Sequence, residues 1–121
     1  MTSQALTGRN ILLVEDEYLQ ARETTAILQR AGATVIGPVA NVADAFALIE
    51  TQTPPLAVVD INLGTGPCFE IVERLESAGV PFVLLTGYDQ FSIPEKYAGI
   101  PLAEKPVNEA LLVEMIQRLC D

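Results

Sequence analysis

Five short apolar segments recur along this chain, and they constrain its fold more than any other feature. Each is apolar at nearly every position rather than at alternate positions, which is typical of strands covered on both faces of a parallel sheet. The predicted strands are Asn10–Val14, Ala33–Ile36, Leu56–Val59, Pro81–Leu85 and Ile100–Ala103.

Stretches with helical spacing of apolar residues separate these strands. The predicted helices are Tyr18–Ala31, Val42–Thr51, Pro67–Ala78 and Val107–Leu119. Asn41 is a suitable N-cap, and Gly32 and Gly79 are typical residues at which a helix ends. The connection Gly87–Gly99 contains a proline and little apolar periodicity, so we expect a short or mobile fourth helix there.

Regular alternation of strands and helices predicts an α/β protein with right-handed crossovers. We expect a flavodoxin-like three-layer sandwich, with a five-stranded parallel sheet in the order 2-1-3-4-5 and about five helices. The 121 residues, half of them hydrophobic, are enough for a single domain spanning 1–121. Residues 1–9 are polar and are expected to form a loose leader.

Charge and composition exclude several classes of function. The net charge of −9 disfavours a nucleic-acid or anionic-membrane partner, because such binding depends on Lys and Arg. No apolar run approaches the roughly 20 residues that a membrane span needs. Cys68 and Cys120 lack metal-ligand spacing and are interpreted as reduced thiols of a cytoplasmic protein. The absence of histidine excludes His-based triads, His-ligated zinc and a phosphohistidine carrier.

Polar side chains follow four of the predicted strands. Glu15 and Asp16 come after the first, Asp60 after the third, Thr86 after the fourth and Lys105 after the fifth. Open parallel sheets bind ligands outside the carboxyl ends of their strands, near the point where strand order reverses. In the order 2-1-3-4-5 the first and third strands are neighbours, so these acids should converge.

Converging carboxylates need a compensating cation. Two like charges 4 Å apart repel by about 4 kcal/mol at an effective dielectric constant near 20. A hard divalent cation with oxygen ligands relieves this repulsion, and Mg²⁺ retains sites for waters and phosphate oxygens. An ammonium and a hydroxyl facing a carboxylate are suited to hold a phosphoryl oxygen, so Asp60 is the candidate nucleophile in phosphoryl transfer.

Four segments of the chain resemble the receiver domains of two-component response regulators, over about residues 9–119. They are 11–17 (Ile-Leu-Leu-Val-Glu-Asp-Glu), 58–62 (Val-Val-Asp-Ile-Asn), 84–87 (Leu-Leu-Thr-Gly) and 104–106 (Glu-Lys-Pro). The resemblance implies that Asp60 is the phosphorylation site. It also implies that Glu15, Asp16, Asp60 and the backbone carbonyl of Asn62 bind Mg²⁺, that Thr86 and Lys105 contact the phosphoryl group, and that the Lys105–Pro106 bond is cis.

The chain departs from the usual receiver pattern in two places. Leu102 occupies the position, three residues before the lysine, at which receivers usually carry a switch aromatic, and the stretch between Thr86 and Lys105 is short. These departures resemble a subgroup of stand-alone bacterial receivers with the signature Phe-Ala-Thr-Gly-hydrophobic-Tyr. Leu84 and Leu85 replace the Phe and Ala of that signature, and Tyr88 supplies its tyrosine.

The expected function is that of a single-domain response regulator. A sensor histidine kinase or phosphotransfer protein would donate the phosphoryl group, and the product would act on a downstream protein or as a phosphorelay shuttle or sink. Such a protein is not an enzyme beyond its own phosphorylation and dephosphorylation. Two alternatives remain: a pseudo-receiver that binds partners without phosphorylation, and an aspartyl-phosphate phosphatase, which Asn62 disfavours because such enzymes place a second acid at that position.

Overall fold

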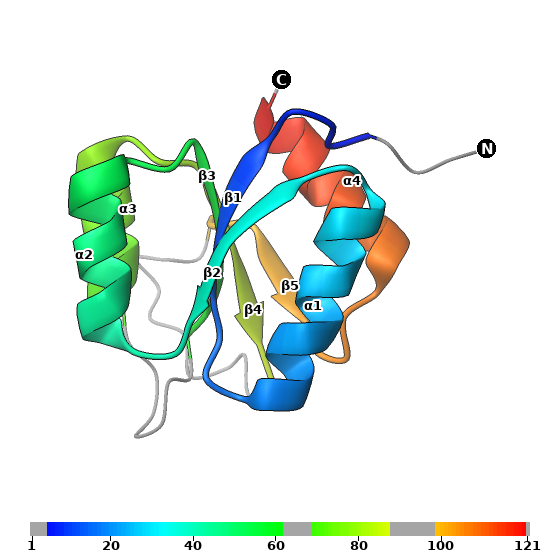
Figure 1. Cartoon of the computed structure of the whole chain (residues 1–121), viewed down its shortest axis with the longest axis horizontal. Helices are drawn as coiled ribbons and strands as arrows, with labels where there is room; N and C mark the ends of the chain where they lie inside the picture. Colours follow the sequence, from blue (N-terminus) through cyan, green and yellow to red (C-terminus); the bar gives the residue numbers. More distant parts are fainter. Residues whose placement is uncertain (1–4, 62–68, 88–98, 121) are drawn as a thin grey trace.

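The computed structural model describes residues 5–61, 69–87 and 99–120, and its centre is a five-stranded parallel sheet (Figure 1). The strands are β1 (Asn10–Val14), β2 (Thr34–Val39), β3 (Leu56–Asp60), β4 (Phe82–Thr86) and β5 (Leu102–Glu104). The spatial order is β2-β1-β3-β4-β5, as the sequence predicted. The described helices are α1 (Tyr18–Arg30), α2 (Val42–Gln52), α3 (Glu70–Ala78) and α4 (Glu109–Cys120).

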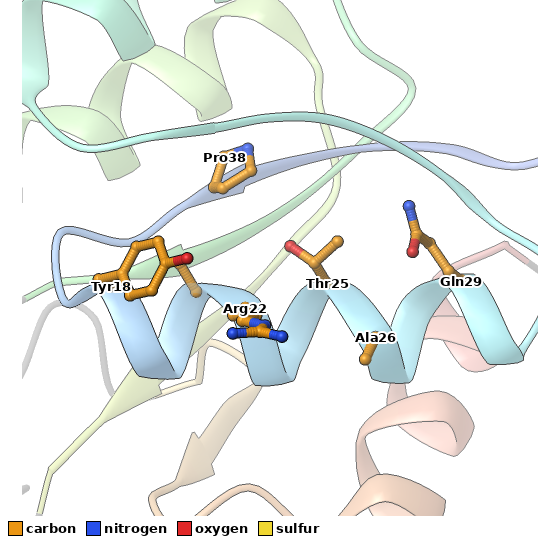
Figure 2. A pocket seen from close by; sticks show the side chains of 7 residues that line it. Tyr18, Arg22, Thr25, Ala26, Gln29 and Pro38 are labelled. Carbon is orange, nitrogen blue, oxygen red and sulfur yellow. The ribbon is translucent and has the colours of Figure 1, made fainter.

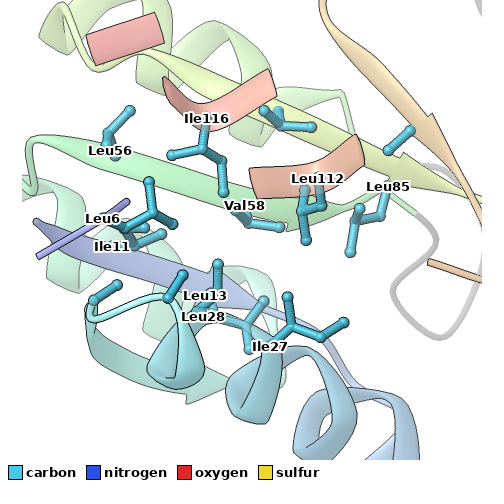
Figure 3. Packing of buried hydrophobic residues seen from close by; sticks show 14 residues of the cluster. Leu6, Ile11, Leu13, Ile27, Leu28, Leu56, Val58, Leu85, Leu112 and Ile116 are labelled. Atoms are coloured by element: carbon cyan, nitrogen blue, oxygen red, sulfur yellow. The ribbon is translucent and has the colours of Figure 1, made fainter. Parts of the chain in front are cut away.

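Helices cover both faces of the sheet and give three layers. Helices α2 and α3 lie on one face, and α1 and α4 lie on the other (Figure 1). Successive strand residues point to opposite faces, so Leu13 joins the core under α1 and α4 whereas Leu12 joins the core under α2 and α3. Figure 3 shows Leu112 and Ile116 of α4 in the first of these cores. Burial on both faces explains why the strands are continuously apolar.

Strand β2 runs further than its sequence predicts. It continues to Val39 through a cis Gly37–Pro38 bond, a pair that reads as a turn in the sequence. Because β2 is an edge strand that pairs only with β1, the missing N–H of Pro38 is tolerated. Gly37 has φ +100°, and a Cβ there would lie 2.8 Å from the Val39 nitrogen, so this position requires glycine.

The helix ends follow the predicted caps with one exception. The Asn41 side chain caps α2 by accepting from the Asp44 N–H, and Gly79 ends α3 with a positive φ. The exception is α1, whose N-cap was not predicted: the Glu17 carboxylate caps this helix by accepting from the Gln20 N–H. The expected start of the third helix at Pro67 lies outside the described residues. Residues 88–98 of the connection Gly87–Gly99, where a fourth helix was expected, also lie outside them.

None of the helices in the described part of the chain is long and apolar enough to cross a membrane.

Candidate functional site

The carboxyl edge of the sheet brings together residues that lie up to 90 positions apart. Glu15 follows β1, Asp60 is the last residue of β3, Thr86 is the last residue of β4 and Lys105 follows β5. The strands keep a simple register here, with Asp60 beside Leu85. The Lys105 N–H donates to the Thr86 carbonyl at 2.8 Å, which fixes the chain beyond β5 against the end of β4.

Three carboxylates form an acid cluster, which we define as Glu15, Asp16 and Asp60. One oxygen from each lies within 4.8 Å of one oxygen from each of the others. Glu15 and Asp60 are buried, whereas Asp16 is exposed. The cluster therefore has two buried acids and one exposed acid, and a solvated ion could enter from the exposed side.

The Lys105 ammonium lies between the two buried acids. Its Nζ donates to Asp60 Oδ2 at 2.8 Å and to Glu15 Oε1 at 2.9 Å. The side chains of Glu15 and Asp60 are 0% and 5% exposed, so solvent does not screen these ion pairs as it screens surface pairs.

The buried acids and the lysine perturb one another's protonation. Burial, followed by a hydrogen bond with Asp60, raises the pKa of Glu15 from 4.5 to about 7, although Lys105 opposes this shift. Burial alone would lower the pKa of Lys105, but its hydrogen bonds with Asp60 and Glu15 raise that pKa above 10.5. One positive charge is thus shared by two carboxylates, and Glu15 holds a proton more readily than an ordinary glutamate.

The first turn of α1 is hydrogen-bonded to this site, which sequence reasoning did not predict. Glu15 Oε2 accepts from the Glu17 N–H at 3.2 Å, and Glu17 Oε1 accepts from the Gln20 N–H at 2.8 Å. The Gln20 side chain completes the connection, because its Oε1 accepts from Lys105 Nζ. In the sequence Gln20 was one polar position among several on an amphipathic helix. Its spacing of three residues after the capping acid was the one available signal.

The remaining predicted residues are placed as follows. Thr86 is buried at the end of β4. Leu102 is half-buried and packs against the core under α2 and α3. The Lys105–Pro106 bond is cis, as expected. Asn62 and Tyr88 lie outside the described residues.

The donor set of the acid cluster fits a hard divalent cation. Carboxylate oxygens are the ligands that such ions prefer, and one lysine does not neutralise three acids. Burial, followed by the hydrogen bond with Asp60, raises the pKa of Glu15, and a bound cation would favour its charged form. The site can therefore hold a small cation beside the buried carboxylate of Asp60 and the ammonium of Lys105.

Comparison with known proteins gives a consistent result. A family model described as the response regulator receiver domain matches residues 11–117. The solution structure of SdrG from Sphingomonas melonis Fr1 is 31% identical with a TM-score of 0.82, and the match covers 97% of this chain and 98% of SdrG. A solution structure of the BeF3-activated conformation of SdrG is 31% identical with a TM-score of 0.74, over 88% of this chain and 95% of that one.

A curated relative is longer than this chain. The sensory transduction protein LytT of Bacillus subtilis is 27% identical over 112 residues, which cover 89% of this chain and 46% of LytT. The chain thus spans less than half the length of this relative.

Proposed function

The chain belongs to the response regulator receiver domain family, and on that premise we propose that it accepts a phosphoryl group on Asp60 in a Mg²⁺-dependent reaction. The observation that carries this proposal is the pair of hydrogen bonds from Lys105 to Asp60 and Glu15, within an acid cluster at the carboxyl edge of the sheet. A buried carboxylate, a cation site and an ammonium donor are the parts that phosphoryl transfer needs.

Asp60 would act as the nucleophile. One of its carboxylate oxygens attacks the phosphorus of a phosphohistidine on a sensor histidine kinase or phosphotransfer protein. The new O–P bond forms as the P–N bond breaks, and the imidazole nitrogen keeps the bonding electron pair. Lys105 would donate to a phosphoryl oxygen, and the 2.8 Å hydrogen bond from its ammonium to Asp60 Oδ2 supports this role. Thr86, buried at the end of the neighbouring strand, is the proposed hydroxyl donor.

Glu15, Asp16 and Asp60 would hold the Mg²⁺ ion, together with the backbone carbonyl of Asn62. When bound, the ion neutralises the acids and the incoming phosphoryl charge. Lys105 would then be released from part of its present role as the counter-charge of Glu15 and Asp60.

The same proposal extends to how the signal is used. We propose that the phosphorylated receiver domain acts through protein contacts or as a phosphorelay shuttle or sink. Membership of the Phe-Ala-Thr-Gly-hydrophobic-Tyr subgroup is proposed on Thr86, Gly87 and Tyr88, and it would account for Leu102 in place of a switch aromatic. A cytoplasmic location agrees with a kinase donor.

The test is phosphorylation by a small phosphoryl donor with Mg²⁺, followed by intact-protein mass spectrometry. The wild-type protein should gain one phosphoryl group, and Asp60→Asn should gain none. Asp44→Asn is the matched control, because Asp44 is an exposed acid on α2 that lies outside the acid cluster. A phosphoryl group retained on Asp60→Asn at full stoichiometry would remove Asp60 from its proposed role.

Beryllofluoride with Mg²⁺ distinguishes this proposal from a pseudo-receiver. Saturating beryllofluoride should shift the amide NMR signals around Asp60 and Thr86. An unchanged spectrum, together with no phosphate uptake, would favour a binding module of the same fold.

A further inference from the structure

The Lys105 ammonium uses all its hydrogen-bonding capacity within the protein. A lysine ammonium has three N–H donors. Three acceptors surround Lys105 Nζ: Asp60 Oδ2, Glu15 Oε1 and Gln20 Oε1. Two of these are carboxylates of the acid cluster, and the third is a neutral amide from α1. Gln20 is thus the one acceptor of Lys105 among the described residues that does not belong to the acid cluster.

A closed set of hydrogen bonds determines where Gln20 lies. Glu15 accepts from the Glu17 backbone, Glu17 accepts from the Gln20 backbone, Gln20 accepts from Lys105, and Lys105 donates back to Glu15. The Glu17 cap holds the Gln20 backbone in the first turn of α1, and the buried face of that helix holds the turn beside the strand ends. Gln20 therefore links the first turn of α1 to the Lys105 ammonium.

A cavity beside Lys105 gives its side chain room to move if the hydrogen bond to Gln20 is lost. A cavity of about 140 Å³ adjoins Lys105 and is lined by Gln20, Glu23, Thr24 and residues 105–107. A flexible lysine chain without its third acceptor has room to turn into this cavity, where the exposed Glu23 offers a competing negative charge. Such movement would take the ammonium away from Asp60.

We propose that Gln20 is a positioning residue, which holds the Lys105 ammonium at Asp60 so that it can donate to the phosphoryl group. This inference rests on the proposed function of Asp60. The Gln20 side chain is hydrogen-bonded to Lys105, and it acts through that ammonium. Its amide is neutral, so it holds the ammonium without adding a fourth negative charge to the site.

The variant that tests this role is Gln20→Met, which keeps the length and helix propensity of the side chain but removes the acceptor. Gln29→Met is the matched control, because Gln29 lies on the same helix and lines the pocket beside Pro38 (Figure 2), whereas Lys105 lines a different cavity. Gln20→Glu restores an acceptor oxygen at the same place and serves as the rescue variant.

The first measurement does not depend on phosphorylation. In metal-free protein, the ¹⁵N-labelled Lys105 ammonium should exchange its protons several-fold faster in Gln20→Met than in the wild type, in Gln29→Met or in Gln20→Glu. A double-mutant cycle of Gln20→Met with Lys105→Met should show coupling of about three- to tenfold in the unfolding equilibrium constant. Equal exchange in all variants and additive effects in the cycle would overturn the proposal.

The second measurement is beryllofluoride affinity in the presence of Mg²⁺. Gln20→Met should bind beryllofluoride about three- to tenfold more weakly than the wild type, and Gln29→Met should bind it equally well. Unchanged or tighter binding by Gln20→Met would refute the positioning role while leaving the proposed function intact. If the wild type itself failed to bind, the proposed function would fail, and the amine exchange and the cycle would still decide whether Gln20 holds Lys105.

Discussion

The metal-free protein should lose stability as pH rises from about 5 to 8, and Glu15 should cause the loss. Its pKa is raised from 4.5 to about 7 in the folded state, chiefly by burial. Between these two values the folded protein binds more protons than the unfolded chain, so the free energy of unfolding falls as pH increases. The stabilising contribution is complete below about pH 4.5 and is lost as pH passes through about 7.

The magnitude follows from the two pKa values. A shift of one unit corresponds to about 1.4 kcal/mol. Integrating the proton-binding difference for 4.5 and about 7 gives a loss of about 2 to 3 kcal/mol between pH 5 and 8. This would be a large fraction of the stability of a domain of this size.

Few other groups can obscure this effect. The chain contains no histidine. The pKa of Glu109 is lowered by its hydrogen bond with Arg30, so its contribution changes below about pH 4.5. The pKa of Lys105 is raised above 10.5, so Lys105 stays protonated and its contribution to the free energy of unfolding is constant between pH 5 and 8. Among the described groups with a shifted pKa, Glu15 is therefore the one expected to change protonation between pH 5 and 8.

The assay is urea unfolding in EDTA at several pH values, for the wild type and for Glu15→Gln. The variant cannot ionise at this position and should lose most of the slope. Adding about 10 mM Mg²⁺ should stabilise the wild type more at pH 8 than at pH 5, because the cation and the proton compete for the same carboxylate. Wild-type stability that stays constant or rises with pH, or an equal slope in Glu15→Gln, would refute the reasoning.

Three further predictions concern stability. Leu112→Ala should lower the free energy of unfolding, measured in urea, by about 2–5 kcal/mol because it opens a cavity in the core under α4. Leu111→Ala, at the neighbouring exposed position, should change it by less than about 0.5 kcal/mol. Gly37→Ala should destabilise the protein by more than about 1 kcal/mol because its Cβ would clash with the Val39 nitrogen at a positive φ, and Gly99→Ala, which meets no atom within 4 Å, should not. At neutral pH, millimolar Mg²⁺ should raise the free energy of unfolding by about 0.4–1.5 kcal/mol if its dissociation constant is near a millimolar, and an unchanged melting temperature would count against the cation site.

Much of the fold could be predicted because strands buried on both faces are apolar at nearly every position. Residues Leu12 and Leu13 face opposite cores, so both must be apolar, and the same holds along β3 and β4. The end of β2 could not be predicted in this way. The predicted strand order already placed this strand at the sheet edge, but Gly37 and Pro38 are typical of turns. The sequence did not show that the strand continues through this pair, at a position where a missing N–H costs little.

Some residues of the candidate site could be predicted from the sequence, and one could not. Glu15, Asp60 and Lys105 could be brought together from the sequence because strand order alone determines which strand ends are neighbours. The connection through Gln20 depends instead on how the first turn of α1 meets the strand ends, where the Glu17 carboxylate caps the Gln20 N–H. An exposed polar residue on an amphipathic helix gives no periodic signal, and its importance comes entirely from what stands opposite it. Residues that act on a site from an adjoining helix are therefore the ones that sequence patterns miss first, and in this protein such a residue holds the same ammonium as the two buried acids.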